Sequence, residues 1–133
     1  MANATVCIVE DDEATREAIR GLLLDEGYKV IEASNGAEGQ RMMEASSERL
    51  IVVLDYRLPV LDGCDLLDIV AHDDDLRARH SFVMMSASPR QTVEDCEEAL
   101  DELVVPLLPK PFHIDELVEA VRQAEERLRL DPA

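Results

Sequence analysis

Short apolar runs alternate with segments of helical periodicity along the whole chain. The apolar runs are rich in β-branched residues and in leucine, and such short runs are typical of buried strands. We therefore predict five strands, at residues 5–9, 28–33, 50–54, 81–85 and 104–108.

The segments between these runs repeat apolar residues every three to four positions, as amphipathic helices do. The clearest example is residues 114–130. We predict five helices, at residues 13–26, 36–46, 64–72, 92–103 and 114–130. The charged segment HDDDLRAR, residues 72–79, is expected to be an exposed loop or a frayed helix end.

Strands that alternate with helices predict an α/β fold with helices on both faces of a parallel sheet. We expect a flavodoxin-like (βα)5 doubly wound sheet with strand order 2-1-3-4-5. Pro106 agrees with this order, because proline lacks a ladder N–H and the fifth strand would lie at an edge. The sequence has no internal repeat or linker, so residues 1–133 are expected to form a single domain, with no output domain in this chain.

Composition then excludes several classes of function. No apolar run approaches the roughly 18 residues of a membrane span, and the start MANATVCIVE does not resemble a signal peptide. We therefore expect a cytoplasmic protein without membrane contact. The net charge of -17 repels a phosphate backbone, so nucleic-acid binding by this chain is disfavoured and a basic partner is favoured.

The three cysteines are Cys7, Cys64 and Cys96. They are odd in number and far apart, and none belongs to a CxxC motif. We predict reduced thiols, with Cys7 in the core as a small hydrophobic residue.

Polar residues gather at the predicted carboxyl ends of four strands, where ligands bind in this class of fold. These residues are Glu10, Asp11, Asp55, Ser86 and Lys110. Three neighbouring carboxylates would repel one another strongly unless a cation lay between them. Carboxylate oxygens are the ligands that Mg²⁺ prefers, so we predict a magnesium site, with Mn²⁺ as a possible substitute.

A phosphoryl group would give each of these residues a chemical role. Asp55 would attack phosphorus as a carboxylate nucleophile and form an aspartyl phosphate. The metal would bridge Asp11, Asp55 and the phosphoryl oxygens. Lys110 would pair with one phosphoryl oxygen and Ser86 would donate a hydrogen bond to another.

The residues at these strand ends resemble the response-regulator receiver domains of two-component signalling over essentially the whole chain. The matching pieces are IVEDD (8–12), LDYRLPVLDG (54–63), MMSAS (84–88) and PKPF (109–112). The resemblance implies that Asp55 is the phosphoacceptor, that Ser86 is the Ser/Thr switch residue and that Lys110 is the invariant lysine. It also implies a cis peptide bond between Lys110 and Pro111.

The same resemblance implies a set of metal ligands. Asp11 would ligate Mg²⁺ directly, Glu10 would do so through water, and the backbone carbonyl of Arg57 would be a further ligand. A histidine kinase or a phosphotransfer protein would supply the phosphoryl group. The face formed by residues 92–103, 104–108 and 114–130 would then bind a downstream protein or a second copy of the chain as a homodimer.

Two features depart from the family pattern. Leu107 stands three residues before Lys110, where many members carry Tyr or Phe, which puts the usual coupling to the switch residue in question. Val105 and Pro106 stand where glycine or another small residue is common.

Several alternatives remain open for individual residues. Asp12 could join the metal site, or it could simply favour the start of a helix through the dipole. His72 and His80 flank an acidic run that could trap a metal ion, although a solvated loop is the favoured interpretation. Asp62 and Gly63 fit a turn.

Two other functions compete with a phosphorylation switch. A haloacid-dehalogenase-type phosphatase needs a second acid two residues after its nucleophile, but Arg57 stands there, so we expect no enzyme beyond weak self-dephosphorylation. A constitutive interaction module with a receiver-like fold would have no need of Asp55, Lys110 or the acidic pair. All four are present, and only Leu107 favours this alternative.

Overall fold

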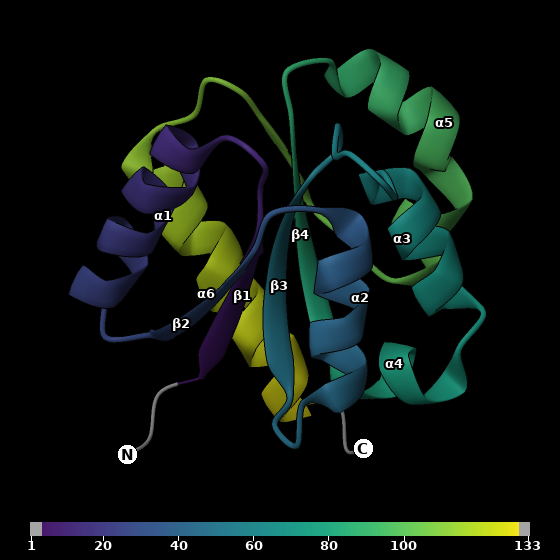
Figure 1. The fold of residues 1–133 in the computed structure, drawn as a ribbon, viewed down its shortest axis with the longest axis horizontal. Helices are drawn as coiled ribbons and strands as arrows, with labels where there is room; N and C mark the ends of the chain where they lie inside the picture. The colour runs from purple at the N-terminus through teal and green to yellow at the C-terminus, as the bar shows by residue number, and fades with distance from the viewer. Residues whose placement is uncertain (1–3, 131–133) are drawn as a thin grey trace.

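The computed structural model describes residues 4–130 and contains a five-stranded parallel sheet in the order β2-β1-β3-β4-β5 (Figure 1). The strands are β1 (Thr5–Val9), β2 (Lys29–Ala33), β3 (Leu50–Asp55), β4 (Ser81–Ser86) and β5 (Leu107–Pro109). The predicted fold class and strand order are therefore confirmed.

Helices cover both faces of this sheet. They are α1 (Glu13–Asp25), α2 (Gly36–Ala45), α3 (Gly63–Ala71), α4 (Asp74–Arg79), α5 (Pro89–Glu102) and α6 (Ile114–Leu130). Figure 1 shows α1 and α6 on one side of the sheet and α2, α3 and α5 on the other. No helix in residues 4–130 has the length and apolar character needed to cross a membrane.

The central strands are buried on both faces, as their continuous apolar runs predict. In β1, Val6 and Ile8 pack into the cluster beneath α1 and α6, whereas Cys7 and Val9 pack into the cluster beneath α2, α3 and α5. The two clusters make this sheet a rigid platform for the residues at its carboxyl edge.

The prediction of an exposed loop or a frayed helix end at residues 72–79 is wrong, because a separate helix, α4, occupies most of that segment. Asp73 caps this helix by accepting a hydrogen bond from the backbone N–H of Leu76 at 3.0 Å. The side chain of Leu76 is buried in the core cluster beneath α2, α3 and α5. A single apolar residue among charged neighbours gives no periodic signal in the sequence.

The fifth strand is shorter than predicted and begins after Pro106. Its position at the sheet edge is confirmed, since it pairs with β4 alone. Residues 104–106, which were predicted as strand, belong to the turn after α5 and to the segment that leads into β5. Val104 in that turn adopts a positive φ of 54°.

The cysteines differ from the prediction of three reduced thiols. Cys64 in α3 and Cys96 in α5 form a disulfide with their Cα atoms 5.4 Å apart, which is an ordinary separation for such a bond. Cys7 is free and buried, as predicted. Spacing in the sequence could not reveal the pair, because it depends on how two helices pack against each other.

Candidate functional site

Three carboxylates meet at the carboxyl edge of the sheet. Glu10 and Asp11 follow β1, and Asp55 is the last residue of β3. Glu10 is 1% exposed and Asp55 is 8% exposed, while Asp11 lies on the surface. Carboxylate oxygens of the three residues all lie within 4.8 Å of one another.

Backbone pairing fixes the position of these carboxylates. The N–H of Glu10 donates to the carbonyl of Ala33 at 3.0 Å, and the N–H of Tyr56 donates to the carbonyl of Met85 at 2.9 Å. The sheet hydrogen bonding thus continues past both acidic residues. The sheet therefore holds the backbone of Glu10 and Asp55 in place.

Lys110 reaches the same cluster from beyond β5. Its ammonium nitrogen lies 2.9 Å from Oε1 of Glu10 and 3.2 Å from Oδ1 of Asp55. Its backbone N–H donates to the carbonyl of Ser86 at 2.7 Å. The peptide bond between Lys110 and Pro111 is cis, which confirms that prediction.

Burial and charge shift the pKa values of this cluster. Burial raises the pKa of Glu10 and of Asp55, and the neighbouring Lys110 ammonium opposes the rise in both. Burial alone would lower the pKa of Lys110, but its hydrogen bond to Glu10 and the charge of Asp55 outweigh that effect and raise it. Lys110 therefore remains a fixed positive charge between two buried carboxylates.

Ser86 ends β4 and is completely buried. Its hydroxyl oxygen accepts a hydrogen bond from the N–H of Ser88 at 2.8 Å and lies 2.7 Å from the hydroxyl of Thr92 in α5. The Thr92 hydroxyl also lies 2.9 Å from the carbonyl of Ser88. Within residues 4–130, the Ser86 side chain is thus bonded to the start of α5 and not to the carboxylates.

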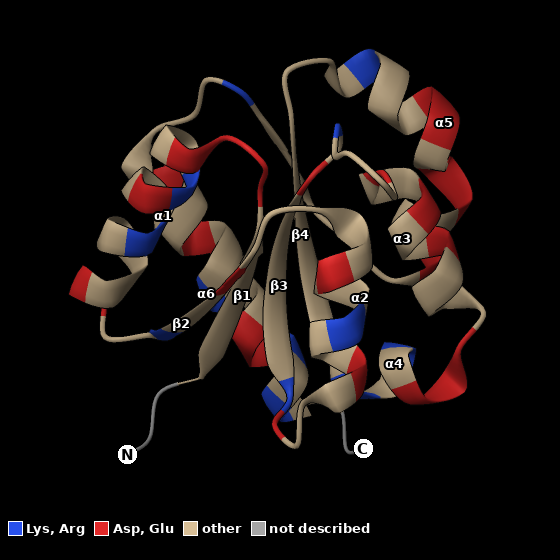
Figure 2. Ribbon diagram, in the orientation of Figure 1, with Lys and Arg blue, Asp and Glu red and all other residues tan. Residues whose placement is uncertain are grey.

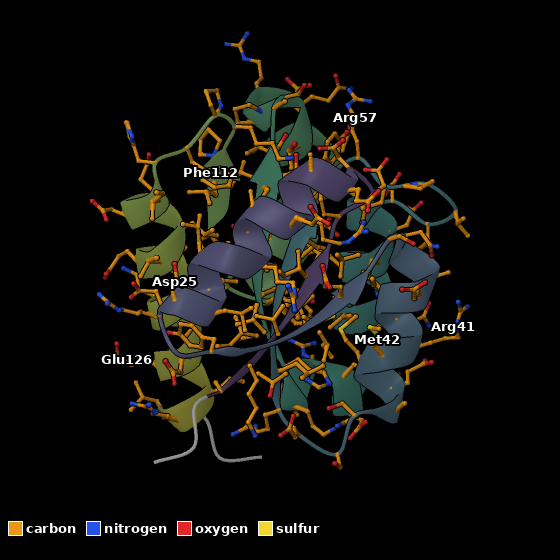
Figure 3. The ribbon with its side chains drawn as sticks, turned by 60° about the vertical axis from the view of Figure 1, so that its left-hand side comes forward. Asp25, Arg41, Met42, Arg57, Phe112 and Glu126 are labelled. Atoms are coloured by element: carbon orange, nitrogen blue, oxygen red, sulfur yellow. A yellow bond between two sulfur atoms is a disulfide. The ribbon has the colours of Figure 1, made fainter. Side chains whose placement is uncertain are left out.

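Arg57 lies on the rim of the site. Its side chain is exposed, and its guanidinium carbon lies 5.4 Å from the centre of the Tyr56 ring. In Figure 3, Arg57 and Phe112 lie at the same end of the molecule. A hollow of about 390 Å³ beside the carboxylates is lined by Asp11, Tyr56, Arg57, Leu58, Pro59 and Asp62.

The sequence did not identify three residues of α5 that contact this region. Thr92 touches Ser86, Asp95 accepts a hydrogen bond from the hydroxyl of Tyr56, and Cys96 bonds to Cys64. The only sequence signal was their spacing, which places all three on one face of a helix.

The remaining candidates have structural roles. The carboxylate of Asp12 accepts a hydrogen bond from the N–H of Thr15 at 2.9 Å and so caps α1. His72 is exposed, whereas His80 is buried and accepts a hydrogen bond at Nδ1 from the N–H of Leu50. The two histidines therefore do not form a metal site with the acidic run, and the solvated loop predicted for His80 is wrong.

The donor set of the carboxylate cluster fits a hard divalent cation. It offers oxygen atoms only, from Glu10, Asp11 and Asp55, and the opening toward Arg57 leaves space for water. Mg²⁺ is bound in this way by a few carboxylates together with water and phosphate oxygens.

Comparison with known proteins agrees with this geometry. The sequence is 33% identical over 127 residues to the response regulator MprA of Mycobacterium ulcerans, covering 95% of this chain and 52% of that protein. MprA of Mycobacterium leprae is likewise 33% identical, over 129 residues, which cover 96% of this chain and 54% of that protein. The chain thus spans about half the length of these curated relatives.

Two solved structures are also similar to the chain. A CheY-like receiver domain protein from Methanospirillum hungatei has a TM-score of 0.80 and 26% identity, with 95% of this chain and 97% of that one covered. The receiver domain of a sensor histidine kinase from Pseudomonas aeruginosa, with magnesium coordinated in its active-site cleft, has a TM-score of 0.80 and 25% identity, with coverage of 92% and 98%.

The sequence pattern of the response regulator receiver domain matches residues 6–122, which include all five strands except Thr5 at the start of β1, and every residue of the carboxylate cluster. The parallel sheet, the acidic residues at its carboxyl edge and the lysine after a cis bond all lie within this match. The chain therefore belongs to the response regulator receiver domain family of two-component signalling.

Proposed function

We propose that Asp55 accepts a phosphoryl group from a histidine kinase or a phosphotransfer protein, and that the phosphorylated domain then binds its downstream partner differently. The observation that carries this proposal is the position of Asp55. Its buried carboxylate lies beside two others, with a lysine ammonium 3.2 Å away, and one of the neighbouring carboxylates, Asp11, lines a polar hollow.

The transfer follows from this arrangement. An oxygen of Asp55 forms a bond to phosphorus as the bond from phosphorus to the donor's leaving group breaks. Lys110 holds its positive charge where negative charge gathers on the phosphoryl oxygens. Positioning and electrostatics therefore supply most of the rate, and Asp55 is well oriented because it ends a buried strand.

Glu10, Asp11, Asp55 and the backbone carbonyl of Arg57 would hold Mg²⁺, or Mn²⁺ in its place. When bound, the ion supplies the positive charge that three carboxylates and a phosphoryl group lack. The magnesium in the active-site cleft of the Pseudomonas aeruginosa receiver domain supports this assignment.

The switch would begin at Ser86. Its oxygen accepts the hydrogen bond from Thr92, so its own proton is free to be donated to the phosphoryl group. Movement of Ser86 toward that group would draw it away from Thr92, which lies in the first turn of α5. The contacts of α5 then change, and the face formed by α5, β5 and α6 presents a different surface to a downstream protein or to a second copy of the chain.

The composition is consistent with the partner and the cellular location expected for this role. The net charge of -17 favours a protein partner over nucleic acid. We place the domain in the cytoplasm, away from membrane contact, and we treat residues 1–133 as one receiver unit.

A constitutive interaction module is the second candidate, and Leu107 favours it. Leu107 is half-buried and packs against the core cluster beneath α2, α3 and α5. A leucine there offers no ring or hydroxyl that could respond to movement of Ser86. In this case the α5–β5–α6 face would bind its partner whether or not Asp55 carried a phosphoryl group.

Intact mass after incubation with acetyl phosphate tests the proposal. We expect one phosphoryl adduct that requires Mg²⁺ and that is lost in Asp55→Asn. Asp11→Asn should reduce Mg²⁺ binding and the adduct together, while Asp12→Asn, next to it on the surface, should retain both. An unmodified wild-type protein that also fails to bind Mg²⁺ would favour the constitutive module.

A further inference from the structure

The disulfide between Cys64 and Cys96 ties α5 to α3 close to the phosphoacceptor. Cys96 is 4% exposed and Cys64 is half-buried. Cys64 lies at the start of α3, directly after the loop that leaves Asp55. The bond therefore connects two helices whose ends both flank the carboxylate cluster.

One face of α5 carries three links to this region. Thr92 is hydrogen-bonded to Ser86, Asp95 accepts from the hydroxyl of Tyr56, and Cys96 is bonded to Cys64. Residues three and four positions apart lie on the same side of a helix, so the three links act on one surface. Two of them are hydrogen bonds that can exchange partners, whereas the disulfide is covalent and breaks only by reduction.

We propose that Cys64 and Cys96 are a reversible redox modification site that controls the mobility of α5. The oxidised pair holds α5 against α3 in the position where Thr92 bonds to Ser86. The reduced pair releases α5, which can then follow Ser86 toward the phosphoryl group. The link to phosphorylation rests on the proposed function of Asp55, while the redox control of α5 does not.

The chemistry is thiol–disulfide exchange. The thiolate of one cysteine attacks an external disulfide, forms a mixed disulfide and releases one external thiol. The second cysteine attacks the mixed disulfide, closes the Cys64–Cys96 bond and releases the second external thiol. The pair loses two electrons and two protons, and the external disulfide gains them; reduction by an external dithiol reverses both steps.

The charged residues around Cys64 and Cys96 determine which thiols can reach the disulfide. A groove of about 440 Å³ between α3 and α5 is lined by Cys64 and Cys96 together with Asp65, Asp68, Glu94, Asp95, Glu97, Glu98 and Ala99. Figure 2 shows acidic residues along both α3 and α5. This negative lining disfavours the approach of an anionic thiolate and favours a thiol that carries positive charge, or an oxidoreductase with a basic face.

Hydrogen exchange of the full chain tests the redox control directly. The protein would be equilibrated with reduced or oxidised glutathione, its free thiols alkylated and counted by mass, and amide exchange measured over residues 89–102. We expect exchange in α5 to be about tenfold faster after reduction, the factor by which loss of a contact worth one hydrogen bond shifts a local opening equilibrium.

Matched variants separate the pair from the third cysteine. Cys64→Ser, Cys96→Ser and the double variant should all show the fast exchange under both conditions. Cys7→Ala should keep the response to glutathione, because Cys7 lies in β1, is not part of the disulfide, and its thiol contacts Met42 of α2. Equal α5 exchange in oxidised and reduced wild-type protein would overturn the proposal, as would two thiols that remain free in oxidised glutathione.

The charge of the reducing thiol provides a further test. Cysteamine, which is cationic, should reduce the pair faster than 2-mercaptoethanesulfonate, which is anionic, and added salt should narrow the difference. Equal rates would contradict access through the acidic groove.

Phosphorylation adds a separate readout. With acetyl phosphate and Mg²⁺, the reduced protein should gain the Asp55 adduct faster than the oxidised protein, and the double serine variant should match the reduced protein. Absence of an adduct in every sample would reject the proposed function of Asp55, while the exchange data would still decide the redox proposal.

Discussion

The ammonium nitrogen of Lys110 lies 3.2 Å from a carboxylate oxygen of Asp55, although the strands that lead to these residues are separated in the sheet by β4. Lys110 also contacts Glu10, which is almost completely buried. One cation therefore compensates two carboxylates that lie in a poorly solvated site.

Replacing this lysine should destabilise the protein. In Lys110→Met the two buried carboxylates lose their partner, and breaking such a buried pair costs about 3–5 kcal/mol of unfolding free energy. Chemical denaturation without divalent ions would measure the loss. Lys29→Met, the same substitution at an exposed site, should change the unfolding free energy by less than about 0.5 kcal/mol. An equal, small effect of both substitutions would contradict the ion pair.

Thr92 supports the switch residue, and its hydroxyl should contribute to stability. Thr92→Val removes a partner of the buried Ser86 hydroxyl, so we expect the unfolding free energy to fall by about 1–3 kcal/mol. Thr92→Ser restores the hydroxyl and should recover part of that loss. If the serine variant were no more stable than the valine variant, the hydroxyl contact would have no energetic role.

Much of the site could be predicted because it follows from strand ends. Apolar runs mark β1 and β3, and the residues that follow them, Glu10 and Asp55, must then meet at one edge of a parallel sheet. Pro106 correctly indicated an edge, although the strand itself begins one residue later.

The missed features depend on how helices pack. The helix begins at Pro89, three residues before the predicted start at Thr92, and nothing in the sequence indicated that the Thr92 hydroxyl would bond to Ser86. The Cys64–Cys96 pair and the Tyr56–Asp95 contact join segments that only the packing of α3 against α5 brings together. Periodicity reports which face of a helix is apolar, but it does not report which helix is its neighbour.

His80 should make stability depend on pH. Burial lowers the pKa of His80 from 6.5 to about 4, because a charged imidazole would lose solvation. Protonation at Nδ1 would also break the hydrogen bond that this nitrogen accepts from Leu50. Above pH 6.5 the folded and unfolded forms both hold a neutral His80. As pH falls from 6.5 to about 4, the unfolded form binds a proton first. The free energy of unfolding therefore falls by about 3 kcal/mol over this range.

Urea denaturation of wild type and His80→Asn between pH 7 and pH 4 would isolate this contribution. The variant lacks the titrating group, so its stability should approach that of wild type as pH falls through this window. His113→Asn, a change at an exposed histidine, should follow the wild-type curve. A constant difference between wild type and His80→Asn at every pH would contradict the expected proton linkage.

Val104 should be replaceable with a gain in stability. It follows Leu103, the C-cap residue of α5, is 60% exposed and has a φ of 54°, a conformation that a β-branched residue rarely adopts. The left-handed region costs an L-residue about 1–2 kcal/mol, and glycine at this position avoids that cost while losing some entropy on folding. We expect Val104→Gly to raise the unfolding free energy by about 1 kcal/mol.

Val93 provides the control, because it is also exposed but lies within α5. Val93→Gly should lower the unfolding free energy by roughly 0.5 kcal/mol, since glycine is the poorer helix former. The same substitution should therefore have opposite signs at two exposed valines that differ in backbone conformation. Thermal or urea unfolding of the two variants would decide this, and a loss of stability in both would argue against the positive φ at Val104.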